Sequence, residues 1–187
     1  RSSKLNEDFG AGSLTESGYP FIVKSLKRGQ NLSEATEVYR GSAKDGGYGV
    51  DPMVMRDSAG AVLATMVSRP LDTYRAEVWD ITGGRPVKLN LPERASIRGM
   101  LGKTGGAPPR LVFTTEENWS INDQQFAQGT LMAVGLRMLR PPPPGVGLVL
   151  TNGDLSVIAP TARQSVEEVR VFDDRVIATV YDNVRGQ

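Results

Sequence analysis

The sequence predicts an all-β fold, and three observations support this prediction. Short β-rich runs bounded by Gly, Pro, Asn or Asp follow one another along the chain. Helical periodicity is nearly absent, because only residues 123–139 could carry an i, i+3, i+4 apolar set, and Gly129 and Gly135 interrupt it. The order of the strands also repeats. The 187 residues, of which 39% are hydrophobic, suffice for one globular domain with a core.

The expected strands are short and separated by turn residues. They are residues 21–26, 36–39, 52–55, 61–67, 74–81, 87–91, 96–101, 111–115, 129–134, 155–158, 166–171 and 176–181. Strands at this spacing are typical of a sandwich, a barrel or a propeller.

Internal repetition distinguishes among these three architectures. Each repeat consists of a strand, a Gly-containing turn, a partner strand and two further strands, over roughly fifty residues, which is the size of a propeller blade. The repeats begin near residues 20, 76 and 129. We therefore predict an incomplete β-propeller of about two to three four-stranded antiparallel blades, with residues 1–187 forming one partial propeller domain.

Two stretches are expected to be flexible loops, at residues 102–109 and 137–153. The prolines at 141–144 cannot donate ladder hydrogen bonds and predict an extended, solvated connector within the second stretch. A ligand for an SH3-type groove is the alternative, but separated prolines with a basic flank are missing. The chain starts with Arg1 and stops at Gln187 directly after a strand-like run, so we expect a fragment of a longer protein.

The composition excludes several kinds of chemistry. The chain contains neither cysteine nor histidine, so it offers no disulfide, no thiolate nucleophile and no imidazole base or metal ligand. A Ser-His-Asp or Cys-His centre cannot be built from these residues alone. We predict no catalytic residue, no cofactor-binding residue, no metal-binding residue and no cofactor in this chain.

The charge pattern bears on possible partners. The 22 basic and 21 acidic residues are interspersed, so no footprint for nucleic acid or for a membrane surface appears. No apolar run approaches the length of a membrane helix, and the polar residues 1–7 are not followed by a signal-peptide stretch. We expect a soluble protein, either cytoplasmic or periplasmic.

Several short motifs are better explained by structure than by function. Gly102-Lys103-Thr104 resembles the end of a phosphate-binding loop, but position 97 is Ile97 where that motif requires glycine. The pairs Glu116-Glu117 and Asp173-Asp174 could suggest acid-base carboxylates, but adjacent side chains on an extended chain point to opposite faces. Asp173-Asp174 instead predicts a hairpin turn. The glycosylation patterns at Asn31 and Asn118 are too common by chance to carry weight.

Two segments carry a distinctive pattern. The first is residues 9–20, from Phe9-Gly10 to Tyr19-Pro20, continuing through residues 22–24 and 27–29. The second comprises residues 159–161, 165–169 and 181–186, which end in the run Asp-Asn-Val-Arg-Gly. Both segments resemble the propeller domain of bacterial prolyl-oligopeptidase-family serine peptidases, and residues 68–74 and 113–129 resemble that family as well. The pattern departs from the family at 103–109 and 136–152.

The resemblance implies a mechanical role. In this family the nucleophile, acid and histidine lie on a separate α/β-hydrolase domain, which is absent from this chain. The propeller covers the hydrolase active site and restricts access to short peptides. We therefore expect a non-catalytic propeller segment whose partners are a covalently linked hydrolase domain and short peptide substrates.

Two alternatives stay open. One is a scaffold or binding propeller of the WD or Kelch kind that mediates protein interactions, although Trp79-Asp80 is the single Trp-Asp pair. The other is a carbohydrate-active propeller enzyme, which would need inward-facing carboxylates converging on one cavity.

Overall fold

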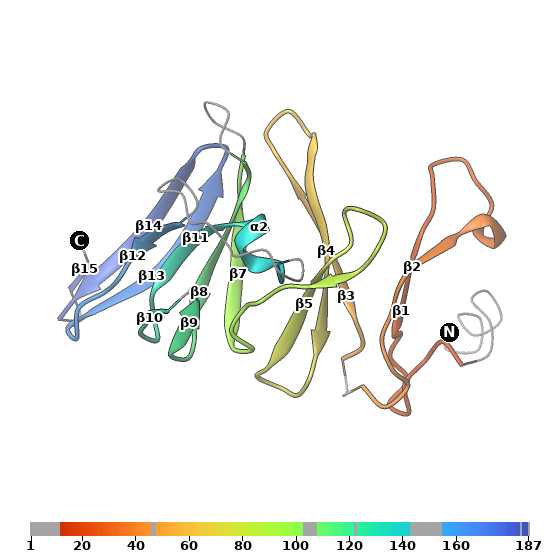
Figure 1. Cartoon of the computed structure of the whole chain (residues 1–187), viewed down its shortest axis with the longest axis horizontal. Coiled ribbons are helices and arrows are strands. Elements are labelled where there is room, and N and C mark those ends of the chain that lie inside the picture. The colour runs from red at the N-terminus through yellow and green to blue at the C-terminus, as the bar shows by residue number, and fades with distance from the viewer. Residues whose placement is uncertain are drawn as a thin grey trace. The chain divides into compact units, whose positions relative to one another are not determined.

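The computed structural model describes residues 12–45, 48–102, 108–121, 123–142, 155–183 and 185–186. The regular structure in these residues is nearly all β-strand (Figure 1). The strands are β1 (Ile22–Ser25), β2 (Thr36–Arg40), β3 (Asp51–Arg56), β4 (Val62–Pro70), β5 (Ala76–Asp80), β6 (Val87–Lys88), β7 (Ala95–Leu101), β8 (Arg110–Thr115), β9 (Trp119–Ile121), β10 (Gln124–Phe126), β11 (Leu131–Gly135), β12 (Leu155–Ile158), β13 (Gln164–Phe172), β14 (Arg175–Asp182) and β15 (Arg185–Gly186). A 3-10 turn, η1 (Leu32–Glu34), and a short helix, α2 (Leu136–Leu139), accompany them. The all-β prediction is confirmed.

The strands form antiparallel meanders. Two sheets have four strands each, in the orders β3-β4-β5-β6 and β7-β8-β11-β12. β1 pairs with β2, and β13 and β14 continue into β15. β9 and β10 form a hairpin inserted in the chain between β8 and β11. Meandering four-stranded sheets are the blades of a propeller. The predicted fold class, an incomplete β-propeller with about two to three four-stranded antiparallel blades, is confirmed.

The predicted grouping of the strands into blades is wrong, because it is shifted by two strands, half a blade, from the observed sheets. The grouping expected from the sequence places β3 and β4 with β1 and β2, whereas β4 pairs with β5, from Met66 opposite Asp80 to Pro70 opposite Ala76. In the same way, β8 pairs with β11, and not with β5 or β6. Four similar strands per repeat give the period but do not mark which strand comes first. Which strand begins each blade is determined by which neighbouring strands a tight turn joins. One such turn follows Pro70.

That turn is closed by Asp72. The Asp72 carboxylate accepts the backbone N–H groups of Tyr74 and Arg75, both at 2.9 Å, and the Arg75 side chain at 2.7 Å. A carboxylate that bonds to its own backbone a few residues on is a characteristic turn signal. It makes β4 and β5 a hairpin and shortens the strand expected at 74–81 to Ala76–Asp80.

The one stretch with helical periodicity is mostly extended. Residues 124–126 and 131–135 are strands, and the helix is confined to the four residues of α2, after which come Arg140, Pro141 and Pro142. All five residues of β11 are buried. A strand buried on both faces reads as a continuous apolar run, which periodicity alone cannot distinguish from a buried helix.

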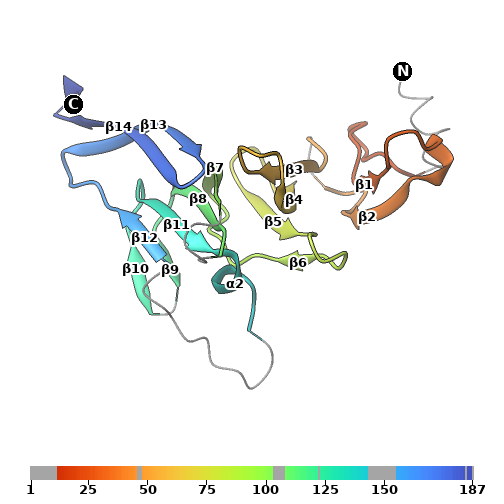
Figure 2. The same ribbon diagram turned by 90° about the horizontal axis from the view of Figure 1, so that it is seen from above.

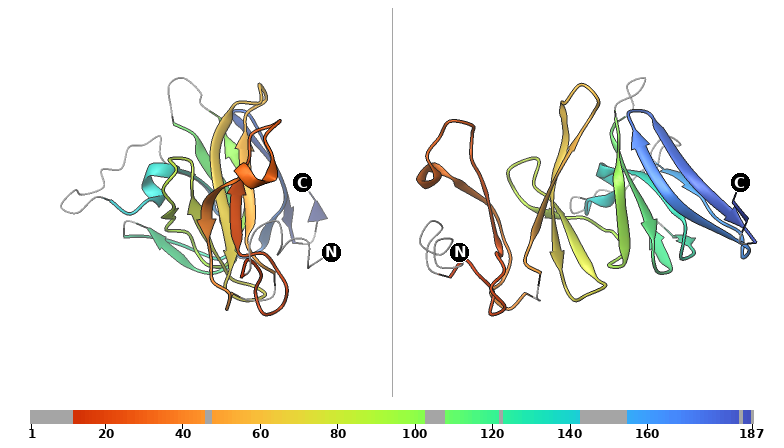
Figure 3. Two further views of the ribbon diagram at one scale, coloured as in Figure 1. Left: turned by 90° about the vertical axis from the view of Figure 1, so that its right-hand side faces the viewer. Right: turned by 180° about the vertical axis from the view of Figure 1, so that it is seen from behind.

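The chain divides into two compact units. The first unit comprises Arg1–Val54 and Ala64–Leu89, and the second comprises Met55–Leu63 and Asn90–Gln187. In the first unit, the β1–β2 sheet lies beside β4 and β5 (Figure 3). Tyr39, Val50, Val67 and Ile81 form its buried cluster.

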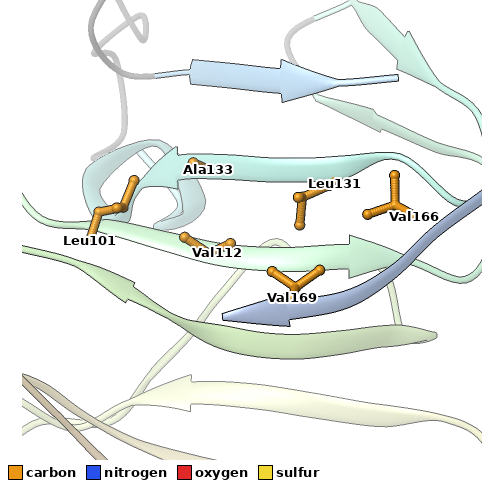
Figure 4. Packing of buried hydrophobic residues seen from close by; sticks show 6 residues of the cluster. All are labelled: Leu101, Val112, Leu131, Ala133, Val166 and Val169. Atoms are coloured by element: carbon orange, nitrogen blue, oxygen red, sulfur yellow. The ribbon is translucent and has the colours of Figure 1, made fainter. Parts of the chain in front are cut away.

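In the second unit, β13 and β14 lie beside the sheet that contains β7, β8 and β11 (Figure 2). Figure 4 shows the six buried residues of this cluster, which the two sheets share. They are Leu101, Val112, Leu131, Ala133, Val166 and Val169. Four partly buried residues of β13 and β14 extend the cluster, namely Val171, Val176, Ala178 and Val180.

A glycine in β7 permits this close packing. Gly99 has φ 151°, and a Cβ built there would lie 3.0 Å from the Cβ of Val171 on β13. The pairing of β7 with β8 shifts register between Ile97 and Gly99. A bulge at a glycine is a usual way to bring two backbones close together.

The expected loops at 102–109 and 137–153 are described only in part. Residues 103–107 and 143–154 lie outside the described residues, as does the first part of the family-like segment, residues 9–11. Gly102 is described, and its N–H donates to the backbone carbonyl of Asp173 at 2.6 Å. Residues 136–139 belong to α2 rather than to an irregular loop.

Candidate functional site

The polar centre of the first unit is an ion pair between β4 and the loop after β2. The Nε and Nη2 atoms of Arg69 donate to Oδ2 and Oδ1 of Asp45 at 2.9 and 2.6 Å. The Ser42 N–H also donates to Oδ2, at 2.8 Å. The side chain of Asp45 is 5% exposed. A bidentate pair of this kind gives directional as well as electrostatic stabilisation.

Glu77 on β5 extends the pair into a network. Its Oε2 accepts the Arg69 Nη1 at 3.4 Å and the indole N–H of Trp79 at 3.3 Å, and its Oε1 accepts Lys88 Nζ at 2.5 Å. Two carboxylates are thus matched by two cations, from strands β4, β5 and β6 and one loop. These contacts link the loop after β2 to strands β4, β5 and β6.

The pKa values agree with a structural role. The hydrogen bond from Arg69 lowers the pKa of Asp45 against the opposing effect of burial. For Glu77 burial acts to raise the pKa, but the bonds from Lys88 and Trp79 and the nearby charges outweigh it, so the net pKa is lowered. Both carboxyl groups are therefore held in the charged form. Burial raises the pKa of the neighbouring Tyr39 to about 12, which keeps its phenol neutral.

The second unit has a polar site where hairpin turns meet. Asp173 lies in the two-residue turn between β13 and β14, flanked by the pair Phe172 and Arg175, and has φ 48°. The hairpin turn predicted for Asp173-Asp174 is confirmed. The Asp173 Oδ1 accepts the Ser58 N–H at 3.0 Å, and its carbonyl accepts the Gly102 N–H. One residue therefore ties together the β3–β4 turn, the end of β7 and its own hairpin.

A cavity of about 550 Å³ opens beside these turns. The residues that line it include Asp57, Asp173 and Asp174. Asp57 is engaged in its own turn, since its Oδ1 accepts the Ala61 N–H at 2.8 Å. Within the described residues, no three His, Cys, Asp or Glu side chains are placed to hold a metal ion.

Glu116 and Glu117, the other predicted pair, have separate partners. The Glu116 carboxylate bonds to the hydroxyl of Ser96, and the Glu117 carboxylate accepts the Arg94 N–H at 3.2 Å. Both contacts fix the start of β7 to the end of β8. The two side chains do not share one site.

The β9–β10 hairpin is a feature that the sequence analysis misses. Trp119 and Phe126 are opposite each other in register, with ring centroids 6.2 Å apart, and Trp119 also meets the buried Phe113 edge-on at 5.7 Å. Trp119 and Phe126, with Asn118 and Gln125, line a cavity of about 510 Å³. The signal that could have found it is the turn pair Asn122-Asp123 between Trp119 and Phe126.

The glycosylation patterns fall on ordinary turn and strand positions. Asn31 precedes η1, where its N–H donates to Glu34 Oε2 at 2.7 Å. The Oδ1 of Asn118 accepts the Gln128 N–H at 3.0 Å and so closes the base of the β9–β10 hairpin. Among the described residues, no helix combines the length and apolar character needed to cross a membrane.

Known proteins resemble this chain in sequence and in fold. No protein-family model matches the chain. The chain is 26% identical over 188 residues to an uncharacterized peptidase, y4nA, of Sinorhizobium fredii (strain NBRC 101917 / NGR234), with 98% of this chain covered. A solved structure of a post-proline cleaving enzyme from Rickettsia typhi matches 94% of the chain with a TM-score of 0.72 at 19% identity.

The predicted resemblance to prolyl-oligopeptidase-family peptidases is confirmed. The sequence match to a peptidase runs along nearly the whole chain, and the match to the post-proline cleaving enzyme shows a common fold. The chain spans about a quarter of the length of each of these relatives, 24% in both cases. Both relatives therefore contain much more chain than the segment to which this one is similar.

Proposed function

We propose that this chain is a non-catalytic propeller segment of a prolyl-oligopeptidase-like serine peptidase. In this proposal residues 1–187 belong to one partial propeller domain, and the catalytic α/β-hydrolase domain lies elsewhere in the same polypeptide. The segment restricts access of short peptides to that domain. The observation that carries the proposal is the match of 98% of this chain to a peptidase of which it spans 24%.

The chemistry of the chain supports a role outside the active site. Serine peptidases of the Ser-His-Asp type need an imidazole base, and this chain has no histidine. Its buried carboxylate pair is neutralised by Arg69 and Lys88. The carboxylates of Asp57, Glu117 and Asp173 accept backbone N–H groups. These groups stabilise sheets and hairpins and do not form a nucleophile-base pair.

The architecture supports restriction of access rather than chemistry. Propellers arrange their blades around a channel that is narrower than a folded domain. A site behind such a channel admits extended oligopeptides and excludes folded proteins. Propellers that serve as binding scaffolds have the same architecture. Experiments therefore have to distinguish restriction of access from binding of a protein partner.

The first experiment tests whether peptide hydrolysis requires residues outside this chain. The full-length gene product and the 187-residue chain are each incubated with a chromogenic proline-containing peptide and with a serine-reactive probe. The full-length protein is expected to hydrolyse the peptide and to be labelled, and the chain alone to do neither. Serine-inhibitor-sensitive turnover by the chain alone would refute its non-catalytic role, and a full-length protein without turnover would favour a scaffold.

The second experiment tests the restriction of access. One proline-containing sequence is offered to the full-length protein as a short peptide, as a long unfolded peptide and within a loop of a folded domain. We expect kcat/KM to fall in that order. Equal kcat/KM for the short peptide and the folded substrate would show that nothing restricts access.

A further inference from the structure

The β9–β10 hairpin is an addition to a sheet that is complete without it. β8 and β11 pair directly with each other in the β7-β8-β11-β12 sheet, and the hairpin occupies the connection between them (Figure 1). Residues 116–130 form this connection, although two antiparallel neighbours can be joined by a turn of a few residues. Ordered insertions between the strands of a rigid scaffold are where binding residues concentrate.

Two buried threonines hold the base of the hairpin in place. Thr115 and Thr130 are each 1% exposed. The Thr130 N–H donates to Thr115 Oγ1 at 3.1 Å, and the Thr115 and Thr130 hydroxyl groups donate to the Ala127 carbonyl at 2.9 and 2.7 Å. The Gly129 N–H donates to the backbone carbonyl of Thr115 at 2.8 Å. Buried polar groups that bond to one another fix a single geometry, so the hairpin is as rigid as a precise binding site requires.

The cavity beside the hairpin combines aromatic surface with neutral polar groups. Trp119 and Phe126 are both partly exposed, and the Trp119 ring packs edge-on against the buried Phe113. The described residues that line the cavity are Asn118, Trp119, Ser120, Gln125, Phe126 and Ala127. None of these six residues is charged. The ligand that suits this lining is therefore itself uncharged.

The polar side chains of the lining supply hydrogen-bond donors. The Oδ1 of Asn118 accepts the Gln128 N–H, so the amide nitrogen is the part of this side chain that can reach a ligand. Gln125 and Ser120 are exposed and directly opposite each other in register, and they add a second amide group and a hydroxyl group. The acceptors that such donors match are the carbonyl oxygens of a ligand.

An uncharged peptide in an extended conformation has the chemistry that matches this cavity. The backbone carbonyls of such a peptide are not bonded within the peptide, and its apolar side chains are free to contact aromatic rings. Grooves lined with aromatic rings are a recurring means of binding extended peptides. An anionic ligand is disfavoured, because the described lining residues include no cation.

We propose that the β9–β10 hairpin is a binding site for an uncharged, extended peptide segment. Trp119 and Phe126 contact apolar side chains of the peptide, and the amide groups of Asn118 and Gln125 donate to its backbone carbonyls. The choice of a peptide as ligand rests on the proposed function, in which peptides are the substrates. A neutral sugar is the competing ligand, since aromatic rings and amide groups can bind it as well.

Photo-crosslinking in the full-length protein tests this site. The probe is a capped peptide of uncharged residues with a benzophenone group, and the protein is first treated with a serine-reactive inhibitor so that the probe stays intact. Trypsin digestion and mass spectrometry then locate the crosslink. Residues 111–137 form one tryptic peptide, because no Lys or Arg lies between Arg110 and Arg137. We expect saturable crosslinking to this peptide, with competition by the same probe sequence without benzophenone.

Two matched variants on β10 separate peptide binding from folding. Gln125→Glu replaces an amide donor at the cavity with a charged acceptor, whereas Gln124→Glu makes the same change at the neighbouring exposed residue, which is not among the described lining residues. We expect Gln125→Glu to raise the Kd of the probe roughly five-fold or more. Gln124→Glu should leave the Kd within about two-fold of the wild type.

The aromatic contribution is measured with a third variant. Trp119→Ala should raise the Kd of the probe roughly ten-fold or more, because the main aromatic contact is lost. Trp119 also packs against Phe113, so this change can disturb the fold. Gln125 is exposed, so Gln125→Glu remains informative in that case.

Equal Kd values in the wild type, Gln125→Glu and Gln124→Glu would overturn the inference, as would the lack of a crosslink within residues 111–137. Tighter binding of maltohexaose, a neutral oligosaccharide, than of the peptide probe at this site would assign the cavity to sugars and overturn the proposed ligand.

The result can be told apart from that of the proposed function. If the full-length protein crosslinks the probe within residues 111–137 but hydrolyses no peptide, the binding site stands and the peptidase assignment fails. If the full-length protein is an active peptidase whose crosslinking is unchanged by Gln125→Glu, the peptidase assignment stands and the binding site fails.

Discussion

The two units of this chain join their sheets by different chemistry. In the first unit, Tyr39 and Trp79 meet with ring centroids 5.7 Å apart, and Arg69 binds Asp45 with two hydrogen bonds. In the second unit, the shared cluster consists entirely of aliphatic side chains. The hydrophobic effect is non-directional, whereas ion pairs depend on geometry and protonation. One architecture therefore predicts two different responses to mutation and pH.

The chain allows the two responses to be measured separately. Of its two tryptophans, Trp79 lies in the first unit and Trp119 in the second. Fluorescence of a Trp119→Phe variant thus reports the first unit, and that of a Trp79→Phe variant reports the second. The predictions below use these two reporters.

The largest effect is expected from a cavity in the aliphatic cluster. Leu131 is 3% exposed, so Leu131→Ala removes buried methyl groups and leaves a void, which should lower the free energy of unfolding by about 3 kcal/mol. Denaturant unfolding followed through Trp119 measures the loss. The control is Val157→Ala on β12, where the side chain is 38% exposed and the loss should stay below about 1 kcal/mol. Equal losses would contradict the burial of this cluster.

The second effect tests the ionic network of the first unit. Arg69→Met leaves the 5% exposed Asp45 carboxylate without its bidentate partner, and we expect a loss of about 2 kcal/mol in the free energy of unfolding followed through Trp79. Arg75→Met is the matched control. The Arg75–Asp72 pair is 49% and 42% exposed, and exposed pairs contribute roughly 0–1 kcal/mol. If both variants lose the same free energy, the network stabilises the first unit no more than an exposed ion pair does.

How much of this could be predicted from the sequence differs from feature to feature. The Asp173-Asp174 turn was predictable because aspartate tolerates a positive φ and bonds to nearby backbone. The strands were predictable because β-branched runs are bounded by turn residues. These signals are local, and the structure confirms them except at the β9–β10 hairpin, which was missed.

Features that depend on distant residues could not be predicted. Asp45 and Arg69 are 24 residues apart and meet only when the β1–β2 hairpin and β4 are brought together. Nothing in either residue's neighbourhood marks the pair. The phase of the blade repeat depended likewise on which of several similar turns closes a hairpin. Which side chains of β13 and β14 are exposed likewise emerges only when the alternation along each strand is combined with the core that covers one side.

A third prediction concerns how closely the sheets of the second unit approach. Gly99→Ala places a methyl group 3.0 Å from the Cβ of Val171, in a backbone conformation with φ 151°. We expect a loss of about 1 kcal/mol or more, because small-to-large changes in packed cores force the backbone apart. Val171→Ala in the same background should recover part of the loss, which a double-mutant cycle through Trp119 fluorescence measures. Additive losses in the cycle would show that Gly99 and Val171 are not in contact.

The smallest effect is a difference in acid sensitivity between the units. The pKa of Asp45 is lowered in the folded chain, chiefly by Arg69, and the net pKa of Glu77 is lowered as well. A lowered folded-state pKa contributes stability above the unfolded-state pKa of about 4, and that stability is lost as the pH falls through the folded-state value.

We therefore expect the first unit, followed through Trp79, to lose stability below about pH 4. Arg69→Met should flatten this dependence, because the partner that lowers the pKa of Asp45 is gone. The change should be smaller than the loss in Arg69→Met itself, since a protonated Asp45 can still accept the Ser42 N–H. The aliphatic cluster of the second unit contains no titratable group. The pH dependence of unfolding followed through Trp119 should therefore not change in Arg69→Met. If the loss of stability at low pH is the same for both reporters and is unchanged by Arg69→Met, acid sensitivity belongs to the chain as a whole. It then does not arise from the network that joins the sheets of the first unit.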